Sequence, residues 1–189
     1  MITIVGVGAL GSHVALFLRN EPEGLKVVDF DKVETKNTQA QFHSTMNLGK
    51  NKAVALRQAF QGLFEVKVLA CPRKLETANA YTLLSSSALV IDCTDNIAAR
   101  KLISTSCKNE MIPLLHGCLS AAGDLARIVW EENFVPDAEG DEKATCVDGE
   151  HLPFFAAAAA FLAVEAQNFL KMGKKRSWQL TPSGILRIA

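Results

Sequence analysis

The stretch MITIVGVGALGSHVALFLR (residues 1–19) sets the fold that we expect for this chain. Residues 1–5 form a short apolar run rich in β-branched side chains, which favours a strand, and the spacing of residues 12–19 predicts a helix. A G-x-G-x-x-G loop lies between them. A glycine loop that joins a strand to a helix is the context in which this motif binds a nucleotide phosphate. The stretch therefore predicts the start of a nucleotide-binding α/β fold.

The residues of this loop have distinct physical roles. Gly6 permits the tight turn, Gly8 lets a phosphate approach the backbone, and Gly11 lets the helix pack closely against the strand. The amides at the helix N-terminus then face the anion. We count Ala9, inside the loop, with the glycines as a cofactor-binding residue. The same motif also occurs as a tight turn that binds nothing, so it is weak evidence alone.

Asp29 strengthens the nucleotide interpretation. It ends a second apolar run, residues 25–28, at the place where an acidic side chain can hydrogen-bond both ribose hydroxyls. Its alternative role is to cap a nearby turn. Because the loop and Asp29 occur at the expected spacing, nucleotide binding is favoured. Both a dinucleotide and ATP remain open at this point.

The rest of the chain alternates between strand-like and helix-like patterns. The expected strands after the first two are residues 65–70, 88–91 and 112–115, and the expected helices after the first are 51–64, 75–84 and 96–107. Such alternation implies a Rossmann-like α/β fold, with a mostly parallel sheet covered by helices on both faces.

The pattern changes after residue 116. We expect an extra strand at 125–130, a polar mobile loop at 131–150, a helix from Pro153 to Met172 and a terminal hairpin of strands 178–181 and 185–188. These C-terminal antiparallel strands extend the sheet. Residues 1–189 form a single domain in this interpretation.

Composition narrows the classes of function. Twenty basic and twenty acidic residues give zero formal net charge, which argues against general nucleic-acid binding. The most apolar window, residues 152–170, contains polar side chains and is typical of a buried helix, so we expect no membrane span. We see no signal peptide, and five irregularly spaced cysteines without a Cys-x-x-Cys pair predict a cytoplasmic protein without a four-cysteine zinc site.

Five motifs, in order and with similar spacing, resemble the ThiF/MoeB family: GVGALGS (6–12), VVDFDKVETKN (27–37), GKNKA (49–53), VIDCTDN (90–96) and ATCVDG (144–149). Its members are ATP-dependent activating enzymes of ubiquitin-like and sulfur-carrier proteins. The resemblance implies that the C-terminal carboxylate of a small β-grasp protein attacks the α-phosphate of MgATP, giving an acyl-adenylate and pyrophosphate. It also implies that the polar segment after Asp31, which has little to bury, covers the nucleotide. Members of the family are commonly homodimers or heterodimers.

The resemblance assigns roles to single residues. Asp29 would hold the ribose, and Asn37 would contact phosphate or the substrate tail. Lys52 would place an ammonium against the phosphates, whereas its alternative is a solvated lysine on a helix face. Asp95 would hold Mg²⁺ directly or through water, and its alternative is the N-cap of the following helix. For Asp31, a site role and a turn-stabilising role are equally open.

Cys146 lies in the polar loop, where relatives often have a cysteine that forms a thioester or acyl-disulfide with the carrier. Its alternative is an unreactive loop cysteine, because the nearby Asp141, Glu142 and Asp148 should raise the pKa of the thiol. The histidines at 43, 116 and 151 show no spacing typical of a metal site or a relay, and we expect them in turns or at the edge of the core.

The chain departs from the family pattern most clearly at Ala40, where the family has an arginine. Removing one donor to a transition state costs about 3 kcal/mol. Three outcomes stay open: Arg100 or Lys50 replaces the guanidinium, a partner chain supplies it, or the chain binds nucleotide without adenylating. We also expect no N-terminal helix to supply a second arginine and no zinc-binding cysteine pairs, and the spacing from Asn37 to Lys52 is one residue short.

Three hypotheses of function follow. The first is adenylation of a small ubiquitin-like or sulfur-carrier protein. The second is a non-catalytic scaffold subunit of the same fold, which Ala40 favours. The third is an NAD-dependent oxidoreductase, which would share the glycine loop and Asp29 but would leave Lys52 and Asp95 without a role.

Overall fold

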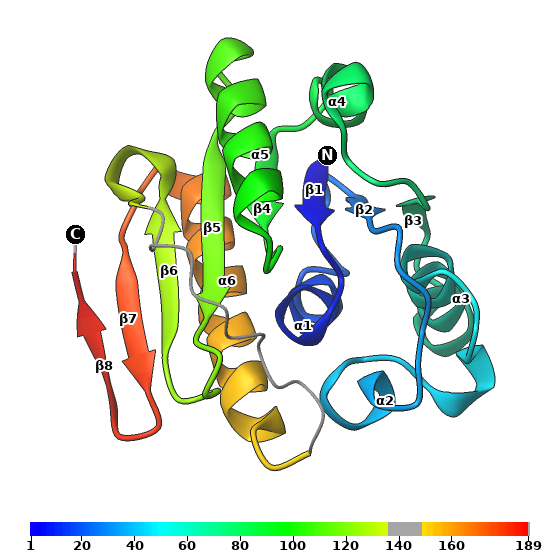
Figure 1. The fold of residues 1–189 in the computed structure, drawn as a ribbon. Coiled ribbons are helices and arrows are strands. Elements are labelled where there is room, and N and C mark those ends of the chain that lie inside the picture. Colours follow the sequence, from blue (N-terminus) through cyan, green and yellow to red (C-terminus); the bar gives the residue numbers. More distant parts are fainter. Residues whose placement is uncertain (136–148, 189) are drawn as a thin grey trace.

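The computed structural model describes residues 1–135 and 149–188, and its centre is one eight-stranded sheet (Figure 1). The strand order is β3-β2-β1-β4-β5-β6-β7-β8. The strands are β1 Ile2–Val5, β2 Leu25–Val28, β3 Val68–Cys71, β4 Leu89–Asp92, β5 Leu114–Leu119, β6 Ala126–Trp130, β7 Trp178–Thr181 and β8 Gly184–Arg187. In this spatial order, the strands from β3 through β2, β1 and β4 to β5 run parallel to one another. Strands β6, β7 and β8 each pair antiparallel with the strand before them. The predicted fold class is confirmed.

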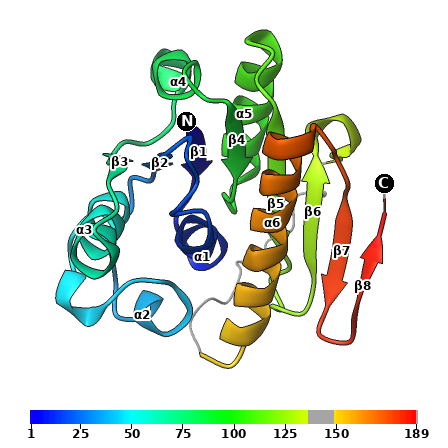
Figure 2. The same ribbon diagram turned by 180° about the vertical axis from the view of Figure 1, so that it is seen from behind.

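Helices cover both faces of the sheet. The helices are α1 Ala9–Phe17, α2 Asn37–Ala40, α3 Lys52–Phe64, α4 Thr77–Leu84, α5 Ile97–Asn109 and α6 Leu152–Met172, with 3₁₀ turns η1 Thr45–Asn47 and η2 Glu131–Asn133. Apolar side chains of α1, α3 and α6 share one core with the sheet, and those of α4 and α5 form a second core on the opposite face. Helix α6 lies behind β5 in Figure 1 and in front of it in Figure 2.

The central strands are buried on both faces, which explains why they are short, continuous apolar runs. The third strand begins at Val68 and not at residue 65, because Glu65 adopts the left-handed conformation that ends α3. The fifth strand runs on to Leu119, because the antiparallel β6 pairs with its second half. The first boundary is set by a local helix cap, whereas the second depends on a strand pairing that lies outside the local pattern.

Helix α6 is long and apolar enough to cross a membrane by length and composition. It packs instead through Ala159, Leu162 and Ala166 into the core shared with α1 and the sheet, as a core helix does. The expectation of a buried helix is confirmed, and Gly173 ends it in the left-handed conformation.

Two segments differ from expectation. The segment after Asp31 contributes to the core, because Val33, Ala40 and His43 are buried. The predicted loop at 131–150 begins with the turn η2, in which Glu131 is held by several side chains. The expected mobility of this loop concerns mainly residues 136–148, which lie outside the described residues.

Candidate functional site

The predicted glycine loop, Asp29 and Asp95 follow strands that end at one edge of the sheet. The chain runs outward from β1 to β3 on one side and then continues with β4 and β5 on the other, so the strand order reverses between β1 and β4. Open α/β sheets bind ligands at the carboxyl ends of strands beside such a reversal. The glycine loop, Asp29 and the turn that contains Asp95 follow β1, β2 and β4 at this edge.

Close backbone packing requires two of the three loop glycines. Gly6 has φ +83°, and a Cβ there would lie 2.9 Å from the Cys93 carbonyl oxygen. A Cβ on Gly11 would lie 1.9 Å from the carbonyl oxygen of Gly6. A Cβ on Gly8 would find only the side-chain nitrogen of Gln41, at 3.9 Å. The space above Gly8 suits a close-approaching phosphate, whereas Gly6 and Gly11 hold the loop against β4 and α1.

Asp29 ties the glycine loop to the end of β2. Its Oδ2 accepts a hydrogen bond from the Val7 amide and its Oδ1 accepts one from the Asp31 amide, both at 2.8 Å. Burial raises the pKa of Asp29, and this outweighs the opposing effects of the Val7 amide and of Lys52. Each carboxylate oxygen has a second lone pair, so Asp29 can still accept from a ribose hydroxyl.

Lys52 is the first residue of α3, and its side chain is only 10% exposed. Its ammonium lies 3.2 Å from Oδ2 of Asp31. Asn51 caps this helix through the Val54 amide and also donates to the Asp29 carbonyl oxygen at 2.8 Å. The alternative of a solvated helix-face lysine is therefore wrong, and Asp31 is the partner of Lys52.

Asn37 and Asp95 are placed very differently. Asn37 is buried at the start of α2, where its Oδ1 accepts from the Glu34 amide at 2.8 Å. Asp95 is exposed in the turn after β4. The alternative of an N-cap role for Asp95 is wrong, because Asn96 caps α5 by accepting from the Ala99 amide.

Ala40 is fully buried, in a small apolar cluster with Ala9 and Phe155. Because this cluster includes Phe155 of α6, an arginine at position 40 would have to enter packed apolar core. The neighbouring Gln41 is also buried, and its side-chain oxygen has no hydrogen-bond partner among the described residues. An unsatisfied buried amide beside the open space above Gly8 fits a ligand with polar groups.

The two cations that one of the three open outcomes assigns to the place of the missing arginine already have hydrogen-bond partners. Arg100 donates to the Cys118 sulfur at 2.7 Å and to the carbonyl oxygens of Thr94 and Gly117. Lys50 donates to the side chains of Asn47 and Gln58 at 3.1 and 3.0 Å. Either cation would have to leave these acceptors to reach a phosphate, so its proposed role stays a prediction.

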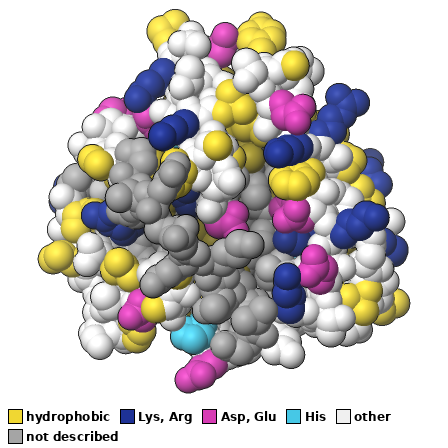
Figure 3. Space-filling view, in the orientation of Figure 1, with side chains coloured by type: hydrophobic (Ala, Val, Ile, Leu, Met, Phe, Trp, Pro, Cys, Tyr) yellow, Lys and Arg dark blue, Asp and Glu magenta, His cyan; other side chains and the backbone are white. Residues whose placement is uncertain are grey.

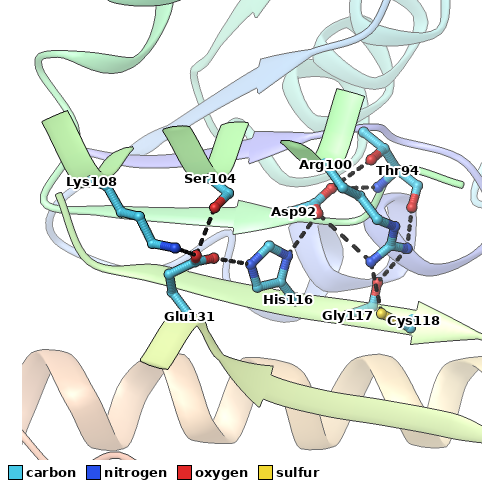
Figure 4. A network of polar contacts seen from close by, with 9 residues as sticks. All are labelled: Asp92, Thr94, Arg100, Ser104, Lys108, His116, Gly117, Cys118 and Glu131. Carbon is cyan, nitrogen blue, oxygen red and sulfur yellow. Dashed lines mark hydrogen bonds and ion pairs between the residues drawn. The ribbon is translucent and has the colours of Figure 1, made fainter. Parts of the chain in front are cut away.

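A buried polar network that we did not predict begins directly beneath this edge (Figure 4). Asp92, at the end of β4, accepts hydrogen bonds from the Thr94 amide and hydroxyl and from His116. Burial alone would raise the pKa of Asp92, but the His116 hydrogen bond and the Arg100 charge outweigh it and lower the pKa. One sequence signal was available: a charged residue and a histidine inside apolar strands must be paired when buried.

His43 and His116 are more buried than expected. His116 is fully buried in this network, so its prediction as a turn or core-edge residue is wrong. His43 is buried beneath the glycine loop, with its Nε2 2.9 Å from the Val7 carbonyl oxygen, and burial lowers its pKa to about 4. His151 is half-buried and stacks on Phe155. Cys146 and its acidic neighbours lie outside the described residues.

Residues 1–135 and 149–188 contain no group of three or more acidic, histidine or cysteine side chains that could hold a metal ion. Magnesium usually takes only one or two protein carboxylates and completes its shell with phosphate and water. An exposed carboxylate such as Asp95 suits that demand. On the face shown in Figure 3, acidic and basic side chains are interspersed over the coloured residues.

The sheet order, the glycine loop after β1 and the acidic end of β2 define a Rossmann-like α/β protein with an edge of the nucleotide-binding type. The chain belongs to the ThiF family, whose family model matches residues 1–179.

Several known proteins are similar to this chain in sequence or in fold. The chain is 27% identical over 179 residues to the molybdopterin-synthase adenylyltransferase of Salmonella typhimurium, over 89% of this chain and 72% of that protein. It is 33% identical over 121 residues to the SAMP-activating enzyme E1 of Haloferax volcanii, over 62% of this chain and 45% of that protein. The crystal structure of E. coli MccB with ATP shares the fold, with a TM-score of 0.78 and 16% identity. That match covers 99% of this chain and 62% of the MccB chain.

Proposed function

We propose that this chain is an adenylyltransferase that uses ATP and Mg²⁺ to activate the C-terminal carboxylate of a small ubiquitin-like or sulfur-carrier protein. The names of the relatives support adenylyl transfer and carrier activation at this general level. The ATP bound to MccB, which has the same fold, supports ATP as the nucleotide.

One observation carries the proposal: hydrogen bonds and backbone packing connect the segments that carry the residues assigned to different parts of the nucleotide. Asp29 accepts from the Val7 amide of the glycine loop, and Asn51, which caps the helix of Lys52, donates to the Asp29 carbonyl oxygen. The turn after β4 joins the same unit, because Gly6 packs directly on its backbone at Cys93. Groups held together in this way can share one nucleotide.

Each group then has a defined task in the reaction. The loop amides and the N-terminus of α1 bind phosphate oxygens. Asp29 accepts from the ribose, and Lys52 turns from Asp31 toward the phosphates, where its charge offsets the negative charge that develops as the carboxylate attacks. Asp95 would hold Mg²⁺, which would neutralise the charge of the leaving pyrophosphate.

The buried Ala40 favours a second candidate, a scaffold subunit that binds partners without adenylating. Because Ala40 is fully buried in one apolar cluster with Phe155, this position supplies no cation for the phosphates. In the first proposal a partner chain, in a homodimer or heterodimer, supplies that cation. Under the scaffold hypothesis the cation is absent, and adenylation takes place on another chain. The hypothesis of an NAD-dependent oxidoreductase gives Lys52 no role, although Lys52 is buried and paired with Asp31 beside the candidate site.

The test is carrier-dependent exchange of labelled pyrophosphate into ATP, with small β-grasp proteins that end in glycine as carriers. We expect exchange that is lost in Lys52→Ala and in Asp95→Ala and kept in Lys67→Ala, a matched change at an exposed lysine just before β3, at the opposite edge of the sheet. A parallel thermal-shift measurement compares MgATP with NAD. Partner binding without any exchange would favour the scaffold, and stabilisation by NAD alone would favour the oxidoreductase.

A further inference from the structure

The network beneath the nucleotide edge is a line of polar side chains along one face of α5. Arg100, Ser104 and Lys108 are spaced four residues apart, so they share that face. Between the two cations lie three groups from β4, β5 and η2, namely Asp92, His116 and Glu131 (Figure 4). Arg100 faces Asp92 at 3.7 Å, and Lys108 faces Glu131 at 2.7 Å.

His116 is the centre of the line. Its Nδ1 lies 2.8 Å from Oδ2 of Asp92, and its Nε2 lies 2.5 Å from Oε2 of Glu131. The ring is fully buried, and Phe134 stacks on it with centroids 3.8 Å apart. Residues 131–135 therefore supply both a partner for His116 and a cover over it.

The cations of α5 stabilise the two carboxyls that His116 joins. Burial opposes ionisation of both carboxyls, but the pKa of Asp92 is lowered by His116 and Arg100, and that of Glu131 by Lys108, Ser104 and His116. Each ring nitrogen of His116 lies against one of these carboxyls, so the ring bridges β4 to η2.

The other oxygen of Asp92 holds the site. Its Oδ1 accepts from the Thr94 amide at 2.9 Å and from the Thr94 hydroxyl at 2.7 Å. Thr94 directly precedes Asp95, the residue proposed to hold Mg²⁺. A shift of Asp92 would therefore move the turn that carries Asp95.

We propose that His116 is a positioning residue, a buried ring that clamps Asp92 to Glu131 and thereby couples the Asp95 turn to residues 131–135. Its role toward magnesium rests on the proposed function. The clamp itself is a property of the unliganded chain. Displacing residues 131–135 removes the partner and the cover of His116 together, and so loosens the turn at the nucleotide edge.

The bridge is tested first, on the wild-type protein. ¹⁵N NMR of the histidine rings should show a hydrogen bond at both ring nitrogens of His116. A His116 ring nitrogen without a hydrogen bond would overturn the proposal. This measurement needs no variant, so it decides even if substitutions in the network prevent folding.

The coupling is tested by amide hydrogen exchange at Thr94. We expect exchange to be at least tenfold faster in His116→Gln and in Glu131→Gln. Ser104→Ala is the matched control, since it removes one bond to Glu131 and leaves the His116 contacts in place, and should change exchange less than twofold. Ile103→Val, an apolar change on the same helix, controls for a general loss of stability. Unchanged exchange in a folded His116→Gln variant would contradict the clamp.

The link to magnesium is tested by the Mg²⁺ dependence of thermal stabilisation by ATP. We expect the half-saturating Mg²⁺ concentration to rise several-fold in His116→Gln, while stabilisation by ATP without Mg²⁺ stays the same. An unchanged Mg²⁺ dependence would remove the positioning role. If the wild type responds to neither ATP nor MgATP, the proposed function fails, and the NMR and exchange results still decide the clamp.

Discussion

Replacing Ala40 with arginine should strongly destabilise this protein, although it restores the family's residue. Ala40 is fully buried against Ala9 and Phe155. Forcing a larger side chain into a packed core costs about 1–3 kcal/mol. Burying an unpaired guanidinium adds several kcal/mol. We therefore expect Ala40→Arg to lower the free energy of unfolding by about 4 kcal/mol or more, a large share of the roughly 5–15 kcal/mol of a typical domain.

A double variant shows whether Phe155 is the obstacle. Phe155→Ala alone should cost about 3–5 kcal/mol, because it leaves a cavity. In Ala40→Arg with Phe155→Ala, the arginine stem occupies the vacated space. The double loss should then be smaller than the sum of the single losses by about 1–3 kcal/mol, as expected for residues in contact.

Urea denaturation of the four proteins measures these terms, and MgATP thermal shift tests whether the double variant gains affinity for the nucleotide. Gln39→Arg is the matched control, because residue 39 is exposed on the same helix, and it should change stability by less than about 0.5 kcal/mol. If Ala40→Arg were as stable as Gln39→Arg, the burial of Ala40 under Phe155 would be refuted.

Three further predictions concern the nucleotide edge. Gly8→Ala should keep its melting temperature but bind ATP more weakly, whereas Gly11→Ala should lose stability, because only the second Cβ meets backbone, at 1.9 Å; equal melting temperatures would contradict this. Asp29→Ala leaves the Val7 amide without its acceptor and should cost about 1–3 kcal/mol in urea denaturation as well as ATP affinity; full stability would show that the bond is dispensable. Burial lowers the pKa of His43 to about 4, so between that pH and an unfolded pKa of about 6.5 the unfolded chain binds the extra proton and stability falls with falling pH. His43→Gln should reduce this slope of the free energy of unfolding against pH by up to about 1.4 kcal/mol per pH unit. An unchanged slope would show that His43 does not cause this pH dependence.

The local pattern of the sequence was enough for the sheet and its loop. The alternation of apolar runs predicted the strands and helices, and β2 and β7 begin and end where expected. The spacing of Gly6, Gly8 and Gly11 between a strand and a helix predicted the loop. These features are decided by the side-chain period and by backbone sterics within a few residues, and both can be read along the chain.

The partners of the site residues were decided by the tertiary structure alone. The sequence left open whether Lys52 serves the site or is a solvated lysine, because its partner, Asp31, is 21 residues away. His116 looked like a core-edge residue because Asp92 and Glu131 come from other elements of the fold. Ala40 was interpreted as the loss of a catalytic arginine. In the fold it is buried in one cluster with Phe155, which belongs to a helix far along the chain. The sequence determined which segments form strands, helices and the glycine loop. Only the packing of segments far apart in the chain decided which charges are paired and which side chains have room, because burial and ion pairing depend on neighbours in space.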